Sequence, residues 1–405
     1  MRSLLKGVKV LELSTYVAAP GAGRILSDMG ADVIKIEPAT GDPHRRFGQN
    51  VNAPVSDEEN PCFQLSNANK RAIAINLKTE EGLEVFYALL KDSNIFLSNT
   101  RIESLRKMKI AYEDLKDRFP HLIYGHLSGY GFKGEDAGLP GYDITAFWAR
   151  GGGMADLAFE GDGPIATPYA VGDNASAMAL TTGLLGALYQ QRMTGKGEYV
   201  LISLFGVSIW INSLMLTPLQ YGDEWPKNRY RPTTPMTTTY VCKDGEMVTL
   251  SVLDYVRDWP KFCDCMGLED YKDDPRYKEP IEVKKPENNE TMVRILIDIF
   301  KKNDRAYWLE RLTSFDLPFS KTQHFREVID DPMAWDNGYL TKFTFETGNT
   351  AAIPNTPIHF GEFKAPPCDR APNVGEHTNE ILAELGYDDA TIKKLNDSNA
   401  VKQRA

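Results

Sequence analysis

The segment "YAVGDNASAMAL" (169–180) places one acidic side chain, Asp173, between a glycine and a run of small residues. Two roles are open to a carboxylate at this place. It can cap the helix that the following "TTGLLGALYQQR" predicts, because an Asp at a helix start accepts hydrogen bonds from free backbone N–H groups and suits the helix dipole. It can also act as a nucleophile, because a carboxylate can attack an acyl carbonyl and form a covalent intermediate.

A carboxylate nucleophile has to stay ionised, and a helix N-terminus is expected to favour its negative charge. It also requires N–H donors for the oxyanion and a site that excludes water, since acyl intermediates otherwise hydrolyse. Gly172 and the small residues Ala175, Ser176 and Ala177 predict that a substrate carbonyl can come close. The spacing of these residues leaves both roles of Asp173 open.

A second candidate chemistry is the binding of phosphates by basic side chains in the first 109 residues. Several of these follow predicted strand ends, where an α/β sheet binds its ligands, and Arg and Lys there suit a nucleotide-like group. The segments "NKR" (69–71) and "NTRIESLRK" (99–107) are the favoured candidates, against the alternative of a solvated basic face. The full set is Lys35, Arg45, Arg46, Lys70, Arg71, Lys78, Arg101, Arg106, Lys107 and Lys109.

The sequence gives less support to a dinucleotide site, a zinc site or a catalytic histidine. "PGAGRIL" offers Gly21 and Gly23, but Leu26 takes the third place of a dinucleotide fingerprint, so an NAD-dependent enzyme is disfavoured. Cys263 and Cys265 have no His or Cys pair to complete a zinc site, and no metal is predicted. His126, on a predicted strand, is expected to be packed, and His377 is expected to begin a helix.

Strand and helix patterns alternate through the first half of the chain. Such alternation predicts strand–helix–strand units and a parallel sheet, so the expected fold class is α/β with a Rossmann-like large domain. The segment rich in Gly and Pro from Gly129 to Pro168 is where such a sheet would present its site. The expected strands are 8–13, 31–37, 71–77, 94–99 and 122–131, and the expected helices are 20–30, 80–93 and 112–120.

Three segments are predicted along the chain. Residues 1–220 form the large domain and include a long helical region at about 176–220. Residues 221–325 form a smaller α+β domain, with a hairpin in "TTYVCKDGEMVTLSV" that turns at Asp244-Gly245 and helices in "ETMVRILIDIFKKND" and "AYWLERLTS". Residues 326–405 hold a strand and two short helices and are expected to return to the large domain.

The composition limits the partners. With 405 residues and a net charge of −10, the chain is unsuited to nucleic acid or an anionic membrane surface as its main partner. Five cysteines at irregular spacing fit a reducing cytosol rather than a disulfide framework. There is no signal-peptide pattern and no run of about 18 apolar residues, so a soluble, cytoplasmic protein is expected.

Six segments, spread over nearly the whole chain, resemble the class III CoA-transferases, the family of formyl-CoA transferase and the CaiB/BaiF proteins. They are "GVKVLELSTYVAAPGAGRILSDMGADVIKIEPATGDPHR", "NANKRAIAINLKTEEG", "SGYG", "LPGYDITAFWARGG", "VGDNASAMALTTGLLGALYQQRMTGKGEYVLISLF" and "APNVGEHTNEIL".

The resemblance implies that Asp173 is the nucleophile and that an aspartyl-CoA thioester forms on it. It implies acyl-CoA and a small carboxylic acid as substrates, no tightly bound cofactor, and an interlocked homodimer whose C-terminal segment closes each ring. The CoA contacts that it implies are Ala18, Ile75, Lys78, Asn99, Thr100, Arg101, Lys107 and Tyr142.

Three departures from formyl-CoA transferases concern the substrate. Val17 replaces a Gln near the reacting acyl group, Pro38 replaces an Arg near CoA, and "RYRPTTPMTTT" (229–239) replaces a glycine-rich loop. "TYVAAP", "LPGYDITAFWARGG" and "NRYRPTTPM" are similar instead to the branch that handles (R)-2-hydroxyacids and 2-enoates in amino-acid fermentation. An acceptor with an apolar side chain, such as (R)-2-hydroxyisocaproate or phenyllactate, is therefore expected.

Two alternatives share the fold that the resemblance implies. α-Methylacyl-CoA racemases carry His in a Gly-His-Asp motif, where this chain has Gly141-Tyr142-Asp143, so proton transfer at the α-carbon is the second choice. A non-catalytic acyl-CoA-binding protein is the third, and it predicts that Asp173 is dispensable.

Overall fold

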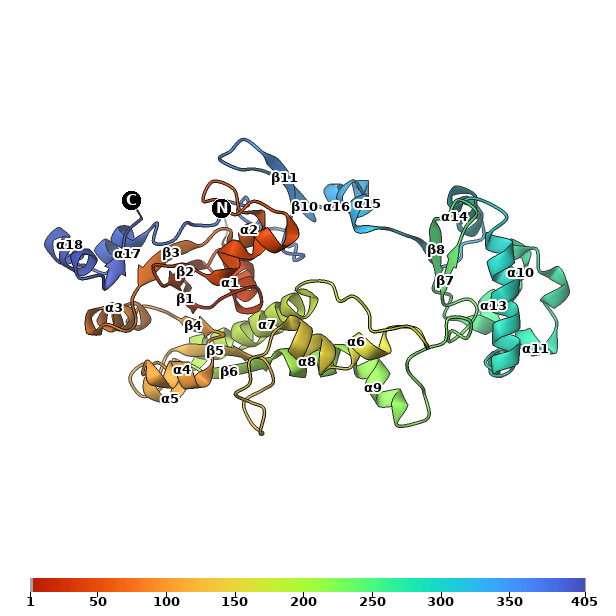
Figure 1. The fold of residues 1–405 in the computed structure, drawn as a ribbon, viewed down its shortest axis with the longest axis horizontal. Helices are drawn as coiled ribbons and strands as arrows, with labels where there is room; N and C mark the ends of the chain where they lie inside the picture. The colour runs from red at the N-terminus through yellow and green to blue at the C-terminus, as the bar shows by residue number, and fades with distance from the viewer. Residues whose placement is uncertain (1–2, 405) are drawn as a thin grey trace. The chain divides into compact units, whose positions relative to one another are not determined.

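The fold is described by a computed structural model that covers residues 3–404. Its largest sheet has seven strands in the order β12-β3-β2-β1-β4-β5-β6 (Figure 1), parallel throughout except that β12 runs antiparallel to β3. The order reverses between β1 and β4, and such a switch point is where parallel sheets bind ligands. The strands are β1 (Lys9–Leu13), β2 (Asp32–Glu37), β3 (Arg71–Ile75), β4 (Ile95–Ser98), β5 (Ile123–Ser128), β6 (Tyr199–Ser203) and β12 (Val401–Lys402).

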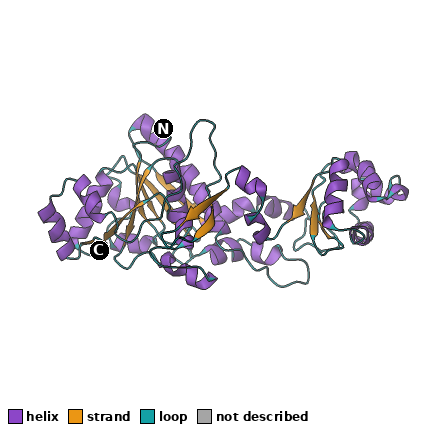
Figure 2. Cartoon of the chain, turned by 90° about the horizontal axis from the view of Figure 1, so that it is seen from above, coloured by secondary structure: helices purple, strands orange, loops and turns teal. Residues whose placement is uncertain are grey.

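Helices surround this sheet, as Figure 2 shows, and the α/β fold class with a parallel sheet is confirmed. Strands β1 to β5 are mostly buried because crossover helices cover both faces of the sheet, whereas β6 at its edge is only partly buried. The associated helices are α1 (Ala18–Asp28), η1 (Pro43–Val51), α2 (Pro61–Asn67), α3 (Glu80–Lys91), α4 (Ile102–Lys107), α5 (Tyr112–Leu115), η2 (Asp143–Ala149), α7 (Val171–Thr194), α8 (Leu204–Ile211), α17 (Thr378–Glu384) and α18 (Asp389–Asp397). Helix α6 (Gly153–Asp156) belongs mostly to the second compact unit described below.

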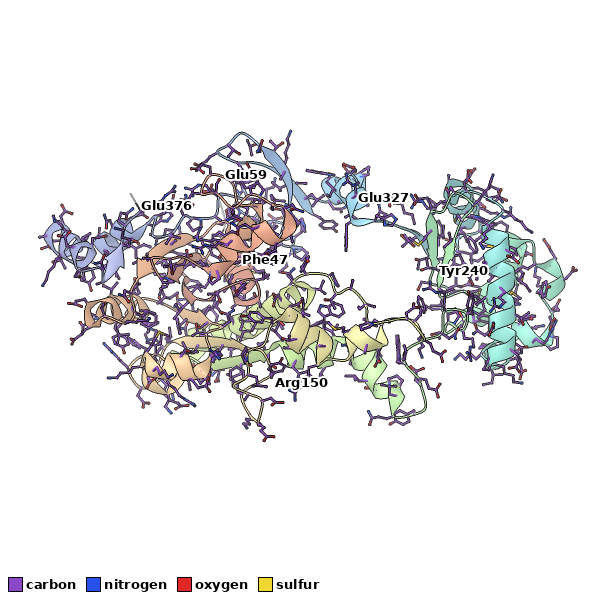
Figure 3. All side chains as sticks on the ribbon, in the orientation of Figure 1. Phe47, Glu59, Arg150, Tyr240, Glu327 and Glu376 are labelled. Carbon is purple, nitrogen blue, oxygen red and sulfur yellow. The ribbon has the colours of Figure 1, made fainter. Side chains whose placement is uncertain are left out.

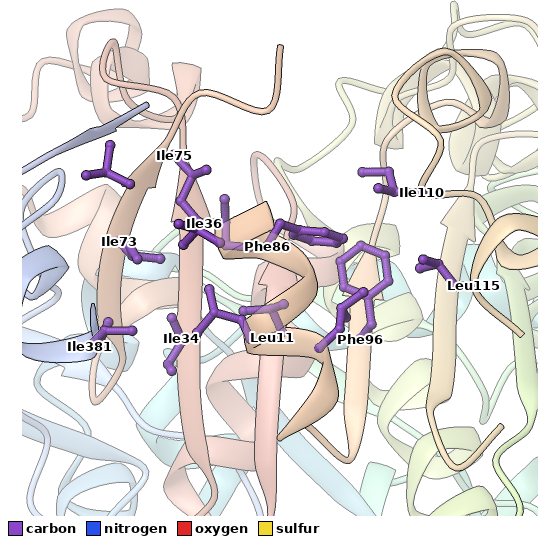
Figure 4. Close-up of a cluster of buried hydrophobic side chains, with 14 of the residues drawn as sticks. Leu11, Ile34, Ile36, Ile73, Ile75, Phe86, Phe96, Ile110, Leu115 and Ile381 are labelled. Carbon is purple, nitrogen blue, oxygen red and sulfur yellow. The ribbon is translucent and has the colours of Figure 1, made fainter. Parts of the chain in front are cut away.

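A single hydrophobic cluster joins the sheet to helices from both ends of the chain (Figure 4). Leu11 and Ile34 come from the first two strands, Phe86 comes from α3, and Ile381 comes from α17 near the C-terminus. All four are less than a tenth exposed. The last segment of the chain therefore shares the core of the sheet.

The structure corrects the prediction of one long helical region over about 176–220. Helix α7 begins earlier, at Val171, and ends at Gly195, which adopts a left-handed conformation with φ of 74°. The run "YVLIS" then forms β6 beside β5, and the chain returns to helix in α8 and α9 (Ser213–Leu219). Asp173 therefore lies inside the first turn of α7 rather than ahead of it.

The chain divides into two compact units, the first being Met1–Gly153, Ala166–Thr217 and Trp335–Ala405 and the second Met154–Ile165 and Pro218–Ala334. The first unit also contains a two-stranded hairpin. Its strands are β10 (Leu340–Thr344) and β11 (Thr350–Pro354).

The second unit is built on the antiparallel sheet β7-β8-β9, with buried aromatic side chains such as Trp259 and Phe300 in its core. The predicted hairpin is confirmed, with Gly245 at φ 83° in the turn. Its elements are β7 (Thr239–Val241), β8 (Met247–Leu250), α10 (Tyr255–Met266), η3 (Glu269–Tyr271), α11 (Pro275–Lys278), α12 (Pro280–Val283), α13 (Pro286–Phe300), α14 (Arg305–Ser314), β9 (Phe319–Thr322) and α15 (Phe325–Ile329). Helix α16 (Pro332–Asp336) lies at the boundary of the two units. Across residues 3–404, no helix has the length and apolar character that a membrane crossing needs.

Candidate active site

A cavity of about 620 Å³ contains Asp173 at the start of α7. It lies beside the switch point of the sheet, because Tyr16 and Val17, just after β1, form part of its wall. The other wall residues come from α1, η1, α2, the segments around Tyr142 and Tyr169, and residues after β11. Segments far apart in the sequence thus meet around one carboxylate.

The side chain that caps α7 is Asp143 and not Asp173. The N-cap residue, Ala170, has a left-handed conformation (φ 60°) and no side chain that can accept a hydrogen bond. Asp143, in the π-helical turn η2, takes this role, because its Oδ1 accepts the backbone N–H of Asp173 at 3.0 Å. The capping interpretation of Asp173 is therefore wrong, and the carboxylate of Asp173 is left to face the cavity.

The same arrangement changes the acidity of Asp173. Burial, followed by the nearby negative charge of Asp143, raises the pKa of Asp173 to about 7. The expectation that the helix N-terminus keeps this group readily ionised is wrong, since Asp143 already occupies the free N–H groups. The pKa of Asp143 is raised as well, by burial, although the backbone N–H groups of Asp173 and Gly172 oppose that rise.

A pH dependence follows from this pair. The nucleophilic role predicted for Asp173 requires the ionised carboxylate, so that role predicts a kcat/KM that rises with pH through about 7, the pKa of Asp173. The Asp143→Asn substitution keeps an oxygen acceptor for the N–H of Asp173 but removes the repelling charge. The rise in kcat/KM should then move to lower pH. Profiles of both proteins from pH 5 to 9 test this, and coincident profiles would show that Asp143 does not set the ionisation of Asp173.

Gly172 serves packing rather than substrate approach. A Cβ built on Gly172 would lie 2.2 Å from Cγ of Phe147 and 2.4 Å from Oδ1 of Asp143. Only glycine therefore lets η2 come close enough to α7 for Asp143 to reach the helix terminus. The predicted role of Gly172 in admitting a substrate carbonyl is corrected accordingly.

Aromatic and aliphatic side chains form most of the cavity wall. His44 stacks on Phe47, labelled in Figure 3, with ring centroids 5.3 Å apart, and Phe47 meets Tyr169 edge-on at 5.9 Å. Tyr16 meets Tyr142 edge-on at 5.6 Å. Apart from Tyr142, sequence reasoning missed these positions, because they come from loops and short helices with no common periodicity. The further apolar wall residues are Val17, Leu65, Ile144 and Met178.

Six of the eight residues predicted to contact CoA line three cavities of the first unit. Tyr142 lines the cavity of Asp173. Ile75 and Lys78 line a second cavity, of about 410 Å³, and Asn99, Thr100 and Arg101 line a third, of about 320 Å³.

Ala18, Lys107 and Asn99 differ in how far their side chains are available to a ligand. The methyl group of Ala18 is buried at the start of α1, so only its main chain is available. Lys107 is exposed at the end of α4. The amide of Asn99 is already engaged, since it accepts the N–H of Thr15 at 3.0 Å and donates to the carbonyl of Thr15 at 2.8 Å. This pair of hydrogen bonds joins the loops after β1 and β4 at the switch point.

Several predicted phosphate ligands are instead paired with carboxylates. Lys35 and Lys70 are buried and lie 3.1 Å and 2.8 Å from the carboxylate oxygens of Glu12. Arg71 contacts Asp32, Glu380 and Glu384, and Arg45 contacts Glu37. The favoured segment "NKR" is therefore wrong as a phosphate site, because its cations neutralise buried or neighbouring acids. Arg101, Arg106 and Lys107 remain exposed.

The disfavoured sites have structural roles. A Cβ on Gly21 would lie 3.0 Å from Cβ of Ala177, and one on Gly23 would lie 2.0 Å from Oε2 of Glu12, so both glycines permit close packing of α1. His126 is buried, with Nδ1 3.1 Å from the Tyr199 hydroxyl and Nε2 2.9 Å from the carbonyl of Thr100. His377 precedes α17.

Known proteins are similar to this chain in sequence and in fold. A family model described as CoA-transferase family III matches residues 5–378. The chain is 41% identical to the (R)-2-hydroxy-4-methylpentanoate CoA-transferase of Clostridioides difficile, over 98% of this chain and 100% of that protein. It is 36% identical to the cinnamoyl-CoA:phenyllactate CoA-transferase of Clostridium sporogenes, over 99% and 98% of the two chains.

Solved structures agree with the family assignment. Rv3272 from M. tuberculosis has a TM-score of 0.82 at 25% identity, covering 94% of this chain and 99% of its own. A CAIB/BAIF family protein from Brucella suis has a TM-score of 0.81 at 26% identity, covering 95% and 100%. The predicted resemblance is confirmed by the family model and by the full-length relatives: the chain belongs to CoA-transferase family III and is a CoA-transferase.

Proposed function

We propose that this CoA-transferase moves CoA from a 2-enoyl-CoA to a free (R)-2-hydroxyacid with an apolar side chain, such as (R)-2-hydroxy-4-methylpentanoate. The observation that carries the proposal is the apolar wall of the 620 Å³ cavity around Asp173. Val17, Phe47 and Met178 offer contacts to a branched or aromatic side chain and none to the second carboxylate of oxalate. The two relatives above are named for (R)-2-hydroxy-4-methylpentanoate and phenyllactate.

The proposed chemistry runs through Asp173 in four steps. A carboxylate oxygen of Asp173 attacks the thioester carbonyl, the carbon–sulfur bond breaks, and a mixed anhydride and CoA thiolate result. The thiolate attacks Cγ of Asp173 and releases the donor as a free carboxylate, leaving an aspartyl-CoA thioester. The acceptor carboxylate then attacks Cγ and expels the thiolate, which finally attacks the acceptor carbonyl and frees Asp173. No net proton is consumed.

The apolar wall serves this chemistry in a second way. Each anhydride or thioester on Asp173 is open to hydrolysis, and a cavity lined by rings such as Tyr16, Phe47 and Tyr169 limits the water that reaches it. The CoA moiety is proposed to use Tyr142 beside Asp173 and the main chain at Ala18. It is also proposed to use the strand ends at Ile75, Lys78 and Asn99–Arg101, and Lys107 at the end of α4.

A panel of acids tests the substrate. Wild-type enzyme with a 2-enoyl-CoA donor should form acyl-CoA from (R)-2-hydroxy-4-methylpentanoate and (R)-phenyllactate at least about tenfold faster than from oxalate or carnitine, because one or two buried methylene groups are worth that factor. Product acyl-CoAs are measured by chromatography. Equal rates across the panel would show that the wall does not select the side chain.

The racemase alternative has less support than transfer. Tyr142 stands where racemases carry His, and Asp143 is committed to capping α7. A racemase would exchange the α-proton of an acyl-CoA for solvent deuterium without any acceptor acid, and no such exchange is expected here.

We also propose that the enzyme is a cytoplasmic homodimer. Trp210 on α8 is 79% exposed and Leu214 on α9 is 84% exposed, and large apolar side chains in such neighbouring positions are typical of an interface. All five cysteines are free thiols, in keeping with a reducing compartment. Light scattering should give twice the 45.4 kDa mass of the chain, and a monomer would contradict the dimer.

A further inference from the structure

A cavity of about 360 Å³, here called the side cavity, lies beside the cavity of Asp173. Its wall is formed by α1 and by residues between 338 and 368, on and after the β10–β11 hairpin. Arg24 of α1 lines both cavities, and so do Asn355 and Thr356. None of the eight residues proposed for CoA lines the side cavity. The side cavity is therefore a separate space that shares a wall with the cavity of Asp173.

The shared wall is made of side chains held by hydrogen bonds. Nε of Arg24 lies 2.7 Å from Oδ1 of Asp28, and the Thr356 hydroxyl donates to Oδ2 of Asp28 at 2.9 Å. The carboxylate of Asp28 is thus paired and does not repel an anion in the side cavity. The amide of Asn355 donates to the Thr341 hydroxyl at 2.7 Å. Because Thr356 is only partly buried, its side chain can turn away and open the wall to a small molecule.

The side cavity places cationic groups beside aromatic rings. Lys364 and His359 line it, and both are exposed. Among residues 3–404, no carboxylate lies within 4.0 Å of Nζ of Lys364. Phe360 and Phe363 contribute two rings whose centroids are 5.7 Å apart. A small carboxylic acid with an apolar side chain suits this combination, because the ammonium group attracts its carboxylate and the rings contact its side chain.

The proposed chemistry requires two acids to pass while CoA stays in place. The donor acid leaves once CoA is joined to Asp173, and the acceptor acid has to arrive before CoA departs. During this interval CoA occupies its own contacts, including Tyr142 in the wall of the Asp173 cavity. An approach that CoA does not use allows the two acids to exchange without the release of CoA.

We propose that the side cavity is the route by which carboxylic acids enter and leave the cavity of Asp173. Lys364 attracts their carboxylate groups from solvent, and Asn355 and Thr356 form the passage between the two cavities. The inference rests on the proposed function, because it assigns a path to the acids of that reaction.

The Lys364→Glu substitution tests this route by comparing the two substrates. kcat/KM for the acceptor acid should fall about fivefold, the size of one reversed charge contact at an exposed site, and the fall should lessen at high salt. kcat/KM for the acyl-CoA donor should change by less than about 1.5-fold, since CoA carries its own contacts elsewhere. Lys364→Arg should behave as the wild type. Lys394→Glu, an equal charge change at an exposed position of α18 outside both cavities, should change neither value.

A second variant tests the route by its width. Ala365→Trp places a large ring in the side cavity from an exposed position, so the fold should be retained. kcat/KM for (R)-phenyllactate should fall at least about fivefold, because the bulky acid meets the new ring. The Kd of CoA, measured by calorimetric titration, should not change.

Four results would overturn the inference. They are an unchanged kcat/KM for the acceptor acid in Lys364→Glu or in Ala365→Trp, an equal fall for the donor, an equal fall in Lys394→Glu, and a Lys364→Arg variant as impaired as Lys364→Glu. If the wild type transfers CoA to no 2-hydroxyacid, the proposed substrate is wrong. The same comparison is then made with the panel acid that the wild type accepts, and a loss confined to that acid still supports the route.

Discussion

The Asp173→Asn variant should transfer no CoA and should nevertheless be more stable than the wild type above pH 7. Activity is lost because an amide cannot form the acyl anhydride, and a loss of at least about a thousandfold is expected for a nucleophile. The gain in stability comes from the same carboxylate, whose pKa is raised to about 7 by burial and by Asp143.

The sign of the stability change follows from linkage. The folded wild type holds the proton of Asp173 up to pH about 7, whereas the unfolded chain releases it near pH 4. As pH rises between these values, the wild type loses stability that the neutral Asn variant keeps. The difference in unfolding free energy should be about 4 kcal/mol at pH 8, from about three pKa units at 1.36 kcal/mol each, and near zero at pH 4.

Urea unfolding at the two pH values measures this difference. The matched control is Asp117→Asn, an exposed carboxyl that should change neither activity nor stability. A variant that retains transfer would defeat the aspartyl mechanism. Equal urea midpoints at pH 8 would show instead that Asp173 ionises at no cost in the folded protein.

The Glu12→Ala variant should lose about 3–5 kcal/mol of unfolding free energy, because it leaves the buried Lys70 without a carboxylate and Lys35 with only Asp42. Glu12 on β1 lies 3.1 Å from Nζ of Lys35 and 2.8 Å from Nζ of Lys70, and all three side chains are fully buried. Asp42, 3.0 Å from Lys35, supplies the only other carboxylate of the cluster among residues 3–404. Burial lowers the pKa of Lys70 to about 8, although Glu12 opposes this change.

The control removes the carboxylate partner of another lysine, Lys9 of β1. Lys9 and Asp92 form an ion pair in which both side chains are more than 40% exposed, and Asp92→Ala should cost less than about 1 kcal/mol. Chemical denaturation of both variants at pH 7 gives the comparison. If Glu12→Ala lowers the unfolding free energy by no more than Asp92→Ala does, then entering water solvates the two lysines or a rearranged Asp42 neutralises them.

The sheet was largely predictable, because its strands are short, continuous apolar runs. "VKVLEL" and "ADVIKIE" predicted β1 and β2 to within one residue. β6 was not predicted, since "YVLISLF" lies between helical patterns and an apolar run of that length suits either state. Its pairing with β5 decides the outcome, and that contact lies about 75 residues away in the sequence.

The site was predictable only in part. The resemblance singled out Asp173, but the group that caps its helix, Asp143, comes from 30 residues earlier, and no local pattern joins the two. The burial of Lys35 and Lys70 likewise could not be predicted from the sequence, because their partner Glu12 lies on a different strand, β1. Side chains that meet across the fold set both the acidity of Asp173 and whether the basic residues are free or paired.

The position of β12 at the sheet edge has a consequence for synthesis on the ribosome. Until residues 401 and 402 have been made and have left the exit tunnel, the outer edge of β3 has no partner strand. An unpaired edge can join the edge of another nascent chain. A chain that lacks β12 therefore exposes the unpaired edge of β3. Chaperones that bind unpaired edge strands should bind stalled or truncated chains more strongly than chains that contain β12.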